Sequence, residues 1–476
     1  MNIECMPKEF EDLPGPAGLP VIGHLHRIRL NKLHLVLEEW AEQYGSIFQI
    51  RIGRNRVAII SDRPTIQEIL RERPAIYRRT SILESVANEI NLNGVFTAED
   101  EAWHRQRKFV TTAFDRQNFR AFFPKLMLIL NRLKKRWDKA ADANEEIDLC
   151  HDLMLFTVDA TMRFAFGIEA NTLETSGPII QQHLDKVFPM VHRRMNAPFP
   201  WWRYIRLPSD RALEKSLAVI EKEIFQIISA TRERLNADSR LRKSPENFLE
   251  AILVAADTEE SGISDAEIFA NVGTLLLAGE DTTANSIAWS IYHFLKYPVF
   301  FKQAQQEVDG ILSLDLVLAN IEQTTTLPII DAVCNETMRH KPVAPILIVQ
   351  AKQGVEIHGY KISEGTTLIL LTRHMAMQEV NFGDAKSFDP TRWLTLKREQ
   401  KLPHDRRSFA PFGSGPRICP GRNLALLQIR VVLAMLCRNY DLETVRSLND
   451  VAEELAFTML PLNLPIKLRR RSVSMS

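Results

Sequence analysis

Cys419 lies in a segment whose composition suits thiolate chemistry. The glycines and prolines of residues 412–421 make a rigid loop whose backbone N–H groups can point at the sulfur, and an apolar run from Leu424 begins a helix just downstream. Backbone donors and a helix N-terminus both stabilise a thiolate. Phe412 would cover one side of the sulfur, and Arg417 would place a cation two residues before it. On the cysteine alone, a turn that contains a buried thiol is the better interpretation.

Acidic groups and hydroxyls interrupt an apolar helical segment further upstream. Glu280, Asp281, Thr282 and Thr283 follow directly on the apolar residues 275–279. Such groups are costly inside a buried helix unless they are paired or used in the chemistry. The structural alternative is a threonine hydroxyl bonded back to its own helix and an acid paired with a distant base.

Two further pairs have helical spacing. Glu336 and Arg339 are three residues apart and therefore share a face of a helix. Such pairs are common on exposed helices, where each stabilises the helix by only tenths of a kcal/mol. Trp103 and Arg107, one turn apart, present an indole N–H and a guanidinium, which suit two carboxylates. The alternative for this pair is an amphipathic helix with a basic face.

The elements that must position these residues are mostly helices. A capping box at residues 264–267 starts a helix that continues to about Lys296, where Pro298 stops it; its roughly 32 residues would extend about 48 Å. Period-2 patterns predict a hairpin with one buried face over residues 48–52 and 57–60, and a second such pair over 355–362 and 366–371. We therefore expect a mainly α fold with small β-sheets (α+β).

The composition excludes several classes of protein. The 476 residues carry 60 Lys and Arg against 59 Asp and Glu, a net charge of +1 that argues against a bulk polyanion binder. Five scattered cysteines do not make a disulfide framework, so we expect reduced thiols in the cytoplasm. No stretch has the length of a signal peptide's apolar core at the N-terminus or the roughly 18 apolar residues of a membrane span. We expect a soluble protein.

Several motifs together resemble those of the cytochrome P450 superfamily. Phe412, Gly415, Arg417, Cys419 and Gly421 reproduce its F-x-x-G-x-R-x-C-x-G signature. Residues 336–339 match its E-x-x-R, residues 388–393 resemble its P-x-R-[FW] segment, and residues 278–282 match its A-G-x-[DE]-T. The motifs occur in the family's order and, together with the Pro-rich entry and Trp103-x-x-x-Arg107, span almost the whole chain. The resemblance implies an extended Pro/Gly-rich entry at residues 1–23, a single P450 domain at 24–467 with a long central helix across the haem, and a basic tail at 468–476.

The resemblance assigns a cofactor and the residues that hold it. Cys419 would be the thiolate ligand of the iron of haem b (iron protoporphyrin IX), where electron donation by the sulfur favours O–O cleavage. The other haem contacts it implies are Phe412, Arg417, Gly421, Trp103, Arg107, Ala278 and Gly279. The missing Cβ of Gly279 would let the helix pass close to the haem. Gln350 stands at the position where the family often has a further cation that contacts the haem propionates.

The resemblance also implies roles in proton transfer and in structure. Asp281 and Thr282 would be catalytic, widening the helix locally and delivering protons to dioxygen. Arg392 would complete a buried structural network with Glu336 and Arg339.

Substrate contacts follow from the family's patches and are mostly apolar. The candidate residues are Val86, Phe96, Leu275, Ala278, Val343, Ala344, Ile346, Leu347 and Phe457. An aromatic cluster, Phe199, Trp201, Trp202 and Tyr204, lies beside His192, Arg193 and Arg194. This cluster either accepts a hydrophobic substrate with an anionic end or simply packs on the fold.

The expected activity is a haem-thiolate monooxygenase that inserts one oxygen atom from O2 into an apolar small molecule such as a fatty acid, terpenoid or steroid. No dinucleotide fingerprint is present, so electrons are expected from a separate donor, a ferredoxin or flavodoxin with its reductase. That donor would dock near Arg417, Arg422 and Arg430. We expect a soluble, bacterial-type member with no nucleic-acid partner. The rivals are a peroxide-dependent or rearranging haem-thiolate enzyme and a non-enzymatic haem sensor.

Overall fold

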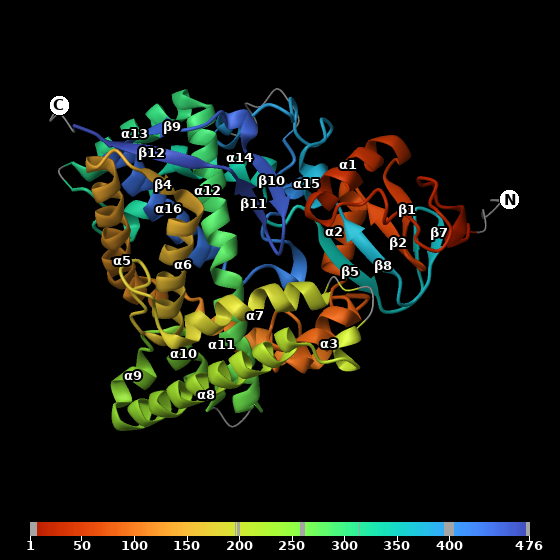
Figure 1. The fold of residues 1–476 in the computed structure, drawn as a ribbon, viewed down its shortest axis with the longest axis horizontal. Coiled ribbons are helices and arrows are strands. Elements are labelled where there is room, and N and C mark those ends of the chain that lie inside the picture. The colour runs from red at the N-terminus through yellow and green to blue at the C-terminus, as the bar shows by residue number, and fades with distance from the viewer. Residues whose placement is uncertain are drawn as a thin grey trace. The chain divides into compact units, whose positions relative to one another are not determined.

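A computed structural model describes residues 7–195, 197, 200–257, 262–313, 315–394 and 404–472 (Figure 1). The chain divides into two compact units. The first, here called the sheet unit, comprises Met1–Glu84, Met338–Cys419 and Glu453–Leu460. The second, here called the helical unit, comprises Ser85–Thr337, Pro420–Ala452 and Pro461–Ser476.

Helices dominate the element order. The α-helices are α1 Leu33–Tyr44, α2 Arg63–Arg71, α3 Ser81–Glu89, α4 Asp100–Ala113, α5 Arg116–Asp142, α6 Leu149–Phe166, α7 Ile179–Met195, α8 Pro208–Ala237, α9 Ser239–Lys243, α10 Phe248–Ala256, α11 Asp265–Gly279, α12 Asp281–Lys296, α13 Pro298–Leu312, α14 Pro328–His340, α15 Thr372–Ala376 and α16 Arg422–Asn439. The strands are β1 Ile47–Ile52, β2 Asn55–Ile60, β3 Tyr77–Arg78, β4 Glu146–Asp148, β5 Leu347–Ala351, β6 Val355–Ile357, β7 Tyr360–Ile362, β8 Thr367–Leu370, β9 Tyr440–Thr444, β10 Ala452–Leu455, β11 Met459–Leu462 and β12 Pro465–Arg470.

The sheet unit is built on a five-stranded sheet of order β1-β2-β8-β5-β3. The predicted hairpin is confirmed, since β1 and β2 pair antiparallel from Ile47 with Ile60 to Ile52 with Asn55. Alternation along β1 places Ile47 in one buried cluster and Phe48 with Ile50 in another. Apolar side chains therefore cover both faces of this sheet, so the expectation of a single buried face is wrong.

The second predicted strand pair is wrong. Residues 355–362 fold back on themselves as β6 and β7, while β8 pairs parallel with β2 and antiparallel with β5. The reason is a two-residue turn at His358 and Gly359, where φ is 52° and 77°. Two consecutive positive φ values are typical of the tight hairpin turn that matches the twist of its strands.

The helical unit contains the predicted central helix, with one interruption. The capping box at its start is confirmed, because Ser264 Oγ accepts from Glu267 N (3.2 Å) and Ser264 N donates to the Glu267 carboxylate (3.0 Å). Glu280, with ψ at −78°, separates α11 from α12, and the two helices follow one another in Figure 1. The break falls beside the acid–alcohol pair, where widening was expected.

The surroundings of the central helix are also helical. Helix α6 packs against α5, α11 and α12, and α16 packs against α12 and α13. A three-stranded sheet of order β4-β12-β9 completes the unit. No helix among the described residues is both long and apolar enough to cross a bilayer.

Candidate functional site

The cysteine loop of the sheet unit has a constrained backbone. Gly413 and Gly415 adopt φ values of 72° and 70°, which side chains with a Cβ rarely adopt. A Cβ on Gly415 would meet the backbone of α2, with the carbonyl carbon of Leu70 only 2.9 Å away. Cys419 N donates to Phe412 O at 2.9 Å, which closes the loop. Only glycine satisfies both the φ and the close approach at residue 415.

Cys419 differs from the other described cysteines in its exposure. Its residue is exposed, whereas Cys334 and Cys437 are buried and Cys150 is half-buried. Burial raises the pKa of Cys150 to about 12 and the pKa values of Cys334 and Cys437 well above their usual range. Those three remain thiols near neutral pH. Cys5 lies outside the described residues, so among the described cysteines Cys419 alone is presented for ligation.

The two arginines of the predicted network converge on one loop. Arg339, fully buried at the end of α14, donates to the carbonyls of Ala376 (3.1 Å), Ala385 (2.8 Å) and Ser387 (3.2 Å). Arg392 donates to carbonyls of the same loop, at Gly383 (3.0 Å) and Asp384 (3.3 Å). Glu336 is also fully buried. The guanidiniums satisfy backbone carbonyls that would otherwise be costly to bury, which is a structural role.

One face in the middle of the central helix is open, although most of the helix is buried. Ala278 is exposed and Thr274, Asp281 and Thr282 are half-buried, while the neighbouring Leu275 is buried. Positions 274, 278 and 282 recur at four residues and therefore share a face. Small side chains at this face leave room for a flat group beside the helix. The Thr282 hydroxyl donates to Ala278 O at 2.7 Å, as the structural alternative predicted.

Gly279 packs closely on α6. A Cβ at Gly279 would lie 3.0 Å from Thr161 Oγ1 and 3.2 Å from its methyl group. Thr161 is fully buried and β-branched, so its side chain can move little to make room for a Cβ. The sequence argument linked this glycine to the haem and missed its contact with α6.

Trp103 and Arg107 lie on α4, as their spacing predicted. Trp103 is buried and Arg107 is half-buried. The neighbouring Arg105 is held by Glu267 of α11 at 2.6 Å. Haem contact by Trp103 and Arg107 remains a prediction, and so does that by Phe412, Arg417 and Gly421. Gln350 is engaged with the backbone, accepting from Ser81 N and donating to Gly365 O.

The candidate substrate residues of the sheet unit are only partly brought together. Met459 N donates to Val343 O at 2.8 Å, which ties the β10–β11 hairpin, with exposed Phe457 at its tip, to the segment of Val343 and Ala344. Ile346 and Leu347 pack on the two different buried clusters of the five-stranded sheet. The side chains of Ile346 and Leu347 therefore do not form one continuous apolar surface.

In the helical unit, the candidates differ in accessibility. Val86 is fully buried in α3 and Leu275 nearly so, whereas Phe96 is half-buried and Ala278 exposed. Phe96 and Ala278 are therefore the more accessible of these four side chains, and their contact with a substrate stays a prediction.

Residues of the aromatic cluster interact with neighbouring carboxylates and with one another. Glu89 accepts from Trp202 Nε1 and Arg203 Nε, both at 2.7 Å. Buried Arg194 pairs with Asp210 at 3.1 Å, and Arg193 lies over the Trp201 ring at 4.8 Å. These contacts favour the packing interpretation over an anion-binding one. The side chains of His192 and Phe199 lie outside the described residues.

A buried charge network in the sheet unit was not predicted. Arg373 of α15 pairs with Glu38 of α1 and Glu453 of β10, both at 2.6 Å. Glu453 also accepts from His34 Nε2 at 2.9 Å and pairs with Lys341. The network therefore anchors the hairpin that carries Phe457. Its members are far apart in the chain, so no spacing could reveal it.

His34 makes the stability of this network depend on pH. Burial, followed by the charge of Arg373, lowers its pKa from 6.5 to about 4. As the pH falls, His34 of the unfolded chain is protonated before His34 of the folded chain. The contribution of His34 to the free energy of unfolding is therefore complete above pH 6.5 and is lost as the pH falls toward 4. Between pH 7.5 and 5 the loss is about 2 kcal/mol.

His34→Gln should flatten this dependence, because the amide keeps a donor for Glu453 but does not titrate. Urea unfolding at pH 7.5 and pH 5 measures it. An equal loss of stability in parent and variant would assign the effect to other groups.

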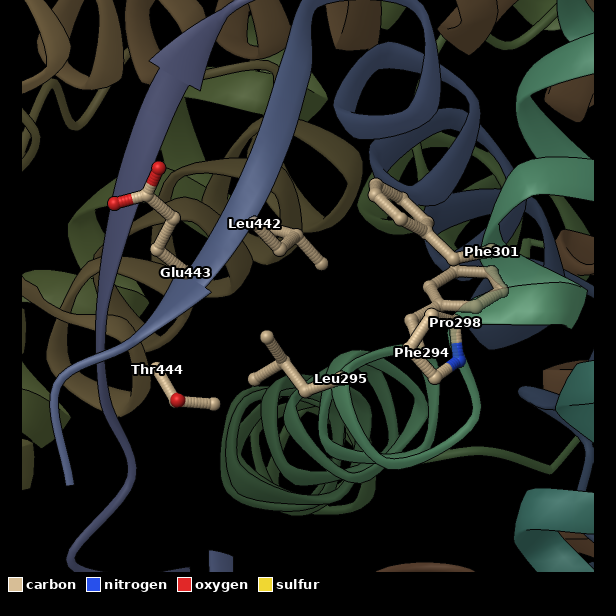
Figure 2. Close-up of a pocket in the computed structure, with 7 residues that line it drawn as sticks. All are labelled: Phe294, Leu295, Pro298, Phe301, Leu442, Glu443 and Thr444. Atoms are coloured by element: carbon tan, nitrogen blue, oxygen red, sulfur yellow. The ribbon is translucent and has the colours of Figure 1, made fainter. Parts of the chain in front are cut away.

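A separate pocket lies at the far end of α12 (Figure 2). It has a volume of about 390 Å³ and is lined by Phe294, Leu295, Pro298, Phe301, Leu442, Glu443 and Thr444. At 1.5 Å per residue, Phe294 is about 18 Å along the helix from Thr282. This pocket is therefore distinct from the open face at Ala278.

Comparisons with known proteins agree with these features. The cytochrome P450 family profile matches residues 13–468. Cytochrome P450 4d10 of Drosophila mettleri is 26% identical over 486 residues, covering 96% of this chain and 91% of the relative. A self-sufficient cytochrome P450 monooxygenase of Aspergillus kawachii is 28% identical over 447 residues; these cover 91% of this chain but only 41% of that relative.

The fold agrees with a solved structure as well. The crystal structure of a mutant cytochrome P450DA heme domain superposes with a TM-score of 0.85 at 22% identity, covering 97% of this chain and 98% of that one. Haem b is the cofactor of the family. The exposed Cys419 thiol and the open, small-residue face of the central helix both fit that group. The chain therefore belongs to the cytochrome P450 family of haem-containing monooxygenases.

Proposed function

We propose that this protein is a haem-thiolate monooxygenase that inserts one oxygen atom from O2 into an apolar small molecule of the fatty acid, terpenoid or steroid kind. The observation that carries the proposal is Cys419, exposed on a constrained loop while the other described cysteines are buried or half-buried. When bound, the haem supplies the redox chemistry that activates dioxygen. Every other requirement falls on the protein.

Asp281 and Thr282 would handle protons at the open face of the helix. A carboxylate can take up a proton from solvent, and the neighbouring hydroxyl can pass it on from Oγ1. The bond from Thr282 Oγ1 to Ala278 O is local, so rotation about χ1 releases the hydroxyl for this role. Both residues are half-buried, which keeps them in reach of solvent.

The substrate class is inferred from accessible apolar side chains, chiefly Phe96, Ala278 and Phe457. Asp210 and Glu89 pair with Arg194 of the aromatic cluster, and Arg193 lies over the Trp201 ring, which weakens the argument for an anionic end on the substrate.

Electrons would come from a separate donor. The family match occupies residues 13–468, so flavin centres must lie outside them, whereas the Aspergillus relative is self-sufficient by name. Arg417 and Arg422 remain the candidate docking cations. Arg430 is a weaker candidate than predicted, because Asp331 holds it in a bidentate pair at 2.6 and 2.9 Å.

Substitutions of the acid–alcohol pair test the activity. With a surrogate ferredoxin and reductase, and an apolar substrate selected by its spectral shift, Asp281→Asn and Thr282→Ala should reduce product formation about 10²-fold or more. Peroxide released per reducing equivalent should rise in Thr282→Ala, and Thr282→Ser should restore coupling.

Ser286→Ala is the matched control, since Ser286 makes the same kind of bond one turn on, to Thr282 O at 2.7 Å. It should leave coupling unchanged. Unaltered product yield in both Asp281→Asn and Thr282→Ala would contradict the assigned roles.

A further inference from the structure

The loop at residues 91–97, which carries Phe96, is held on the central helix by two buried amides. Val95 N donates to Asn271 Oδ1 at 2.8 Å, and Gln106 Nε2 donates to Asn93 O at 3.2 Å. The amides also bond to each other, Asn271 Nδ2 to Gln106 Oε1 at 3.0 Å. The network therefore binds the loop backbone on both sides of Gly94, at the C=O of Asn93 before it and at the N–H of Val95 after it.

Because both amides are buried, losing these hydrogen bonds would be costly in free energy. Asn271 is 1% exposed and Gln106 is 2% exposed. A buried amide without partners is costly, so these side chains stabilise only the loop position that satisfies them. The second Asn271 N–H goes to Glu267 O, one turn back in α11, at 2.7 Å. That bond fixes the orientation in which Oδ1 faces the loop.

Two glycines allow the loop and α11 to approach closely. A Cβ on Gly94 would lie 2.6 Å from Ala270 O and would also strike the Thr274 hydroxyl. A Cβ on Gly273 would strike the side chain of Leu92. The loop thus lies against Thr274, one turn before the exposed Ala278, with Val95 and Phe96 next in the chain.

We propose that Asn271 and Gln106 are positioning residues that fix this loop on α11 and thereby limit the size of the apolar ligand accepted beside Ala278. The inference rests on the proposed function, because it assigns the loop to the substrate side of the haem. Neither amide touches the ligand. They act through the placement of Val95 and Phe96.

The experiment uses the haem-loaded protein with Asn271→Ala, Gln106→Ala and the double variant. Hydrogen exchange reports the loop directly, and exchange in a peptide spanning residues 91–98 should become about five- to tenfold faster in each variant, as expected for a net hydrogen bond. The double variant should add little to either single one. Gly94→Ala disturbs the same packing without touching an amide and should have the same effect.

Ligand size is the second readout. Imidazole and 4-phenylimidazole, followed by the Soret shift, differ by one ring. The ratio of their two dissociation constants should differ between the parent and the variants by about fivefold or more. The reason is that a relaxed loop changes the binding of the larger probe, 4-phenylimidazole.

Asn118→Ala is the matched control, a buried asparagine of α5 that donates to Ala113 O at 3.0 Å. It should leave both readouts unchanged. Unchanged loop exchange, or an unchanged ratio of dissociation constants, in folded Gln106→Ala and Gly94→Ala proteins would overturn the proposal. Failure of the parent to bind haem through a thiolate would instead overturn the proposed function, and the exchange data would still report whether the amides hold the loop.

Discussion

Cys419→Ser is expected to abolish monooxygenase turnover while leaving the polypeptide folded. Serine has the size of cysteine but does not provide a thiolate, so the electron donation that favours O–O cleavage is lost. Changes in the second shell of metal sites already cost about 10–100-fold, and loss of the ligand itself should exceed the upper end of that range. Product formation with a surrogate reductase and a substrate selected by spectral shift measures the effect.

Cys150→Ser provides the matched control. The Cys150 thiol donates only to Pro461 O at 3.7 Å, and its pKa is raised to about 12. We expect this variant to turn over at the rate of the parent. A Cys419→Ser protein that retains product formation would refute the assigned ligand.

Arg339→Leu is expected to have the largest effect on folding. The fully buried guanidinium satisfies the carbonyls of Ala376, Ala385 and Ser387, and it lies over the Phe382 ring at 5.2 Å. Leucine leaves the buried carbonyls of Ala376 and Ala385 without this donor, which should lower the free energy of unfolding by more than about 3 kcal/mol. Arg339→Lys should rescue little, because an ammonium cannot reach three carbonyls at once.

Urea unfolding and the haem content of the purified protein test this expectation. Arg407→Leu is the comparison, since that side chain is 71% exposed and pairs only across the surface with Asp405. It should change stability by less than about 0.5 kcal/mol. If both variants unfold alike, Arg339 is not a structural anchor.

Local sequence signals predicted the elements that depend on local physics. The capping box at Ser264 starts α11, Pro298 follows the end of α12, and the Gly/Pro loop precedes α16. Alternation identified β1 because Phe48 and Ile50 are buried with the half-buried Gln49 and Arg51 between them, whereas residues 57–60 of β2 are buried on both faces. In each case the information lies within a few residues of the element that it determines.

Signals that require distant partners were missed or misread. Pairing of β8 with β2 and β5 depends on residues about 310 and 20 positions away, so periodicity alone could not choose it. Gly279 packs against Thr161, and Glu453 joins α1 to α15; neither contact leaves a pattern along the chain. The motifs identified the family, whereas the packing around them required the structure.

The absorption spectrum of the dithionite-reduced, carbon-monoxide-treated protein is the most direct test of the central claim that Cys419 ligates the haem iron as a thiolate. The parent and Cys150→Ser should show a strongly red-shifted Soret band, and haem-loaded Cys419→Ser should lack it. A haem-loaded, folded parent without that band, or a Cys419→Ser protein that retains it, would contradict thiolate ligation by Cys419.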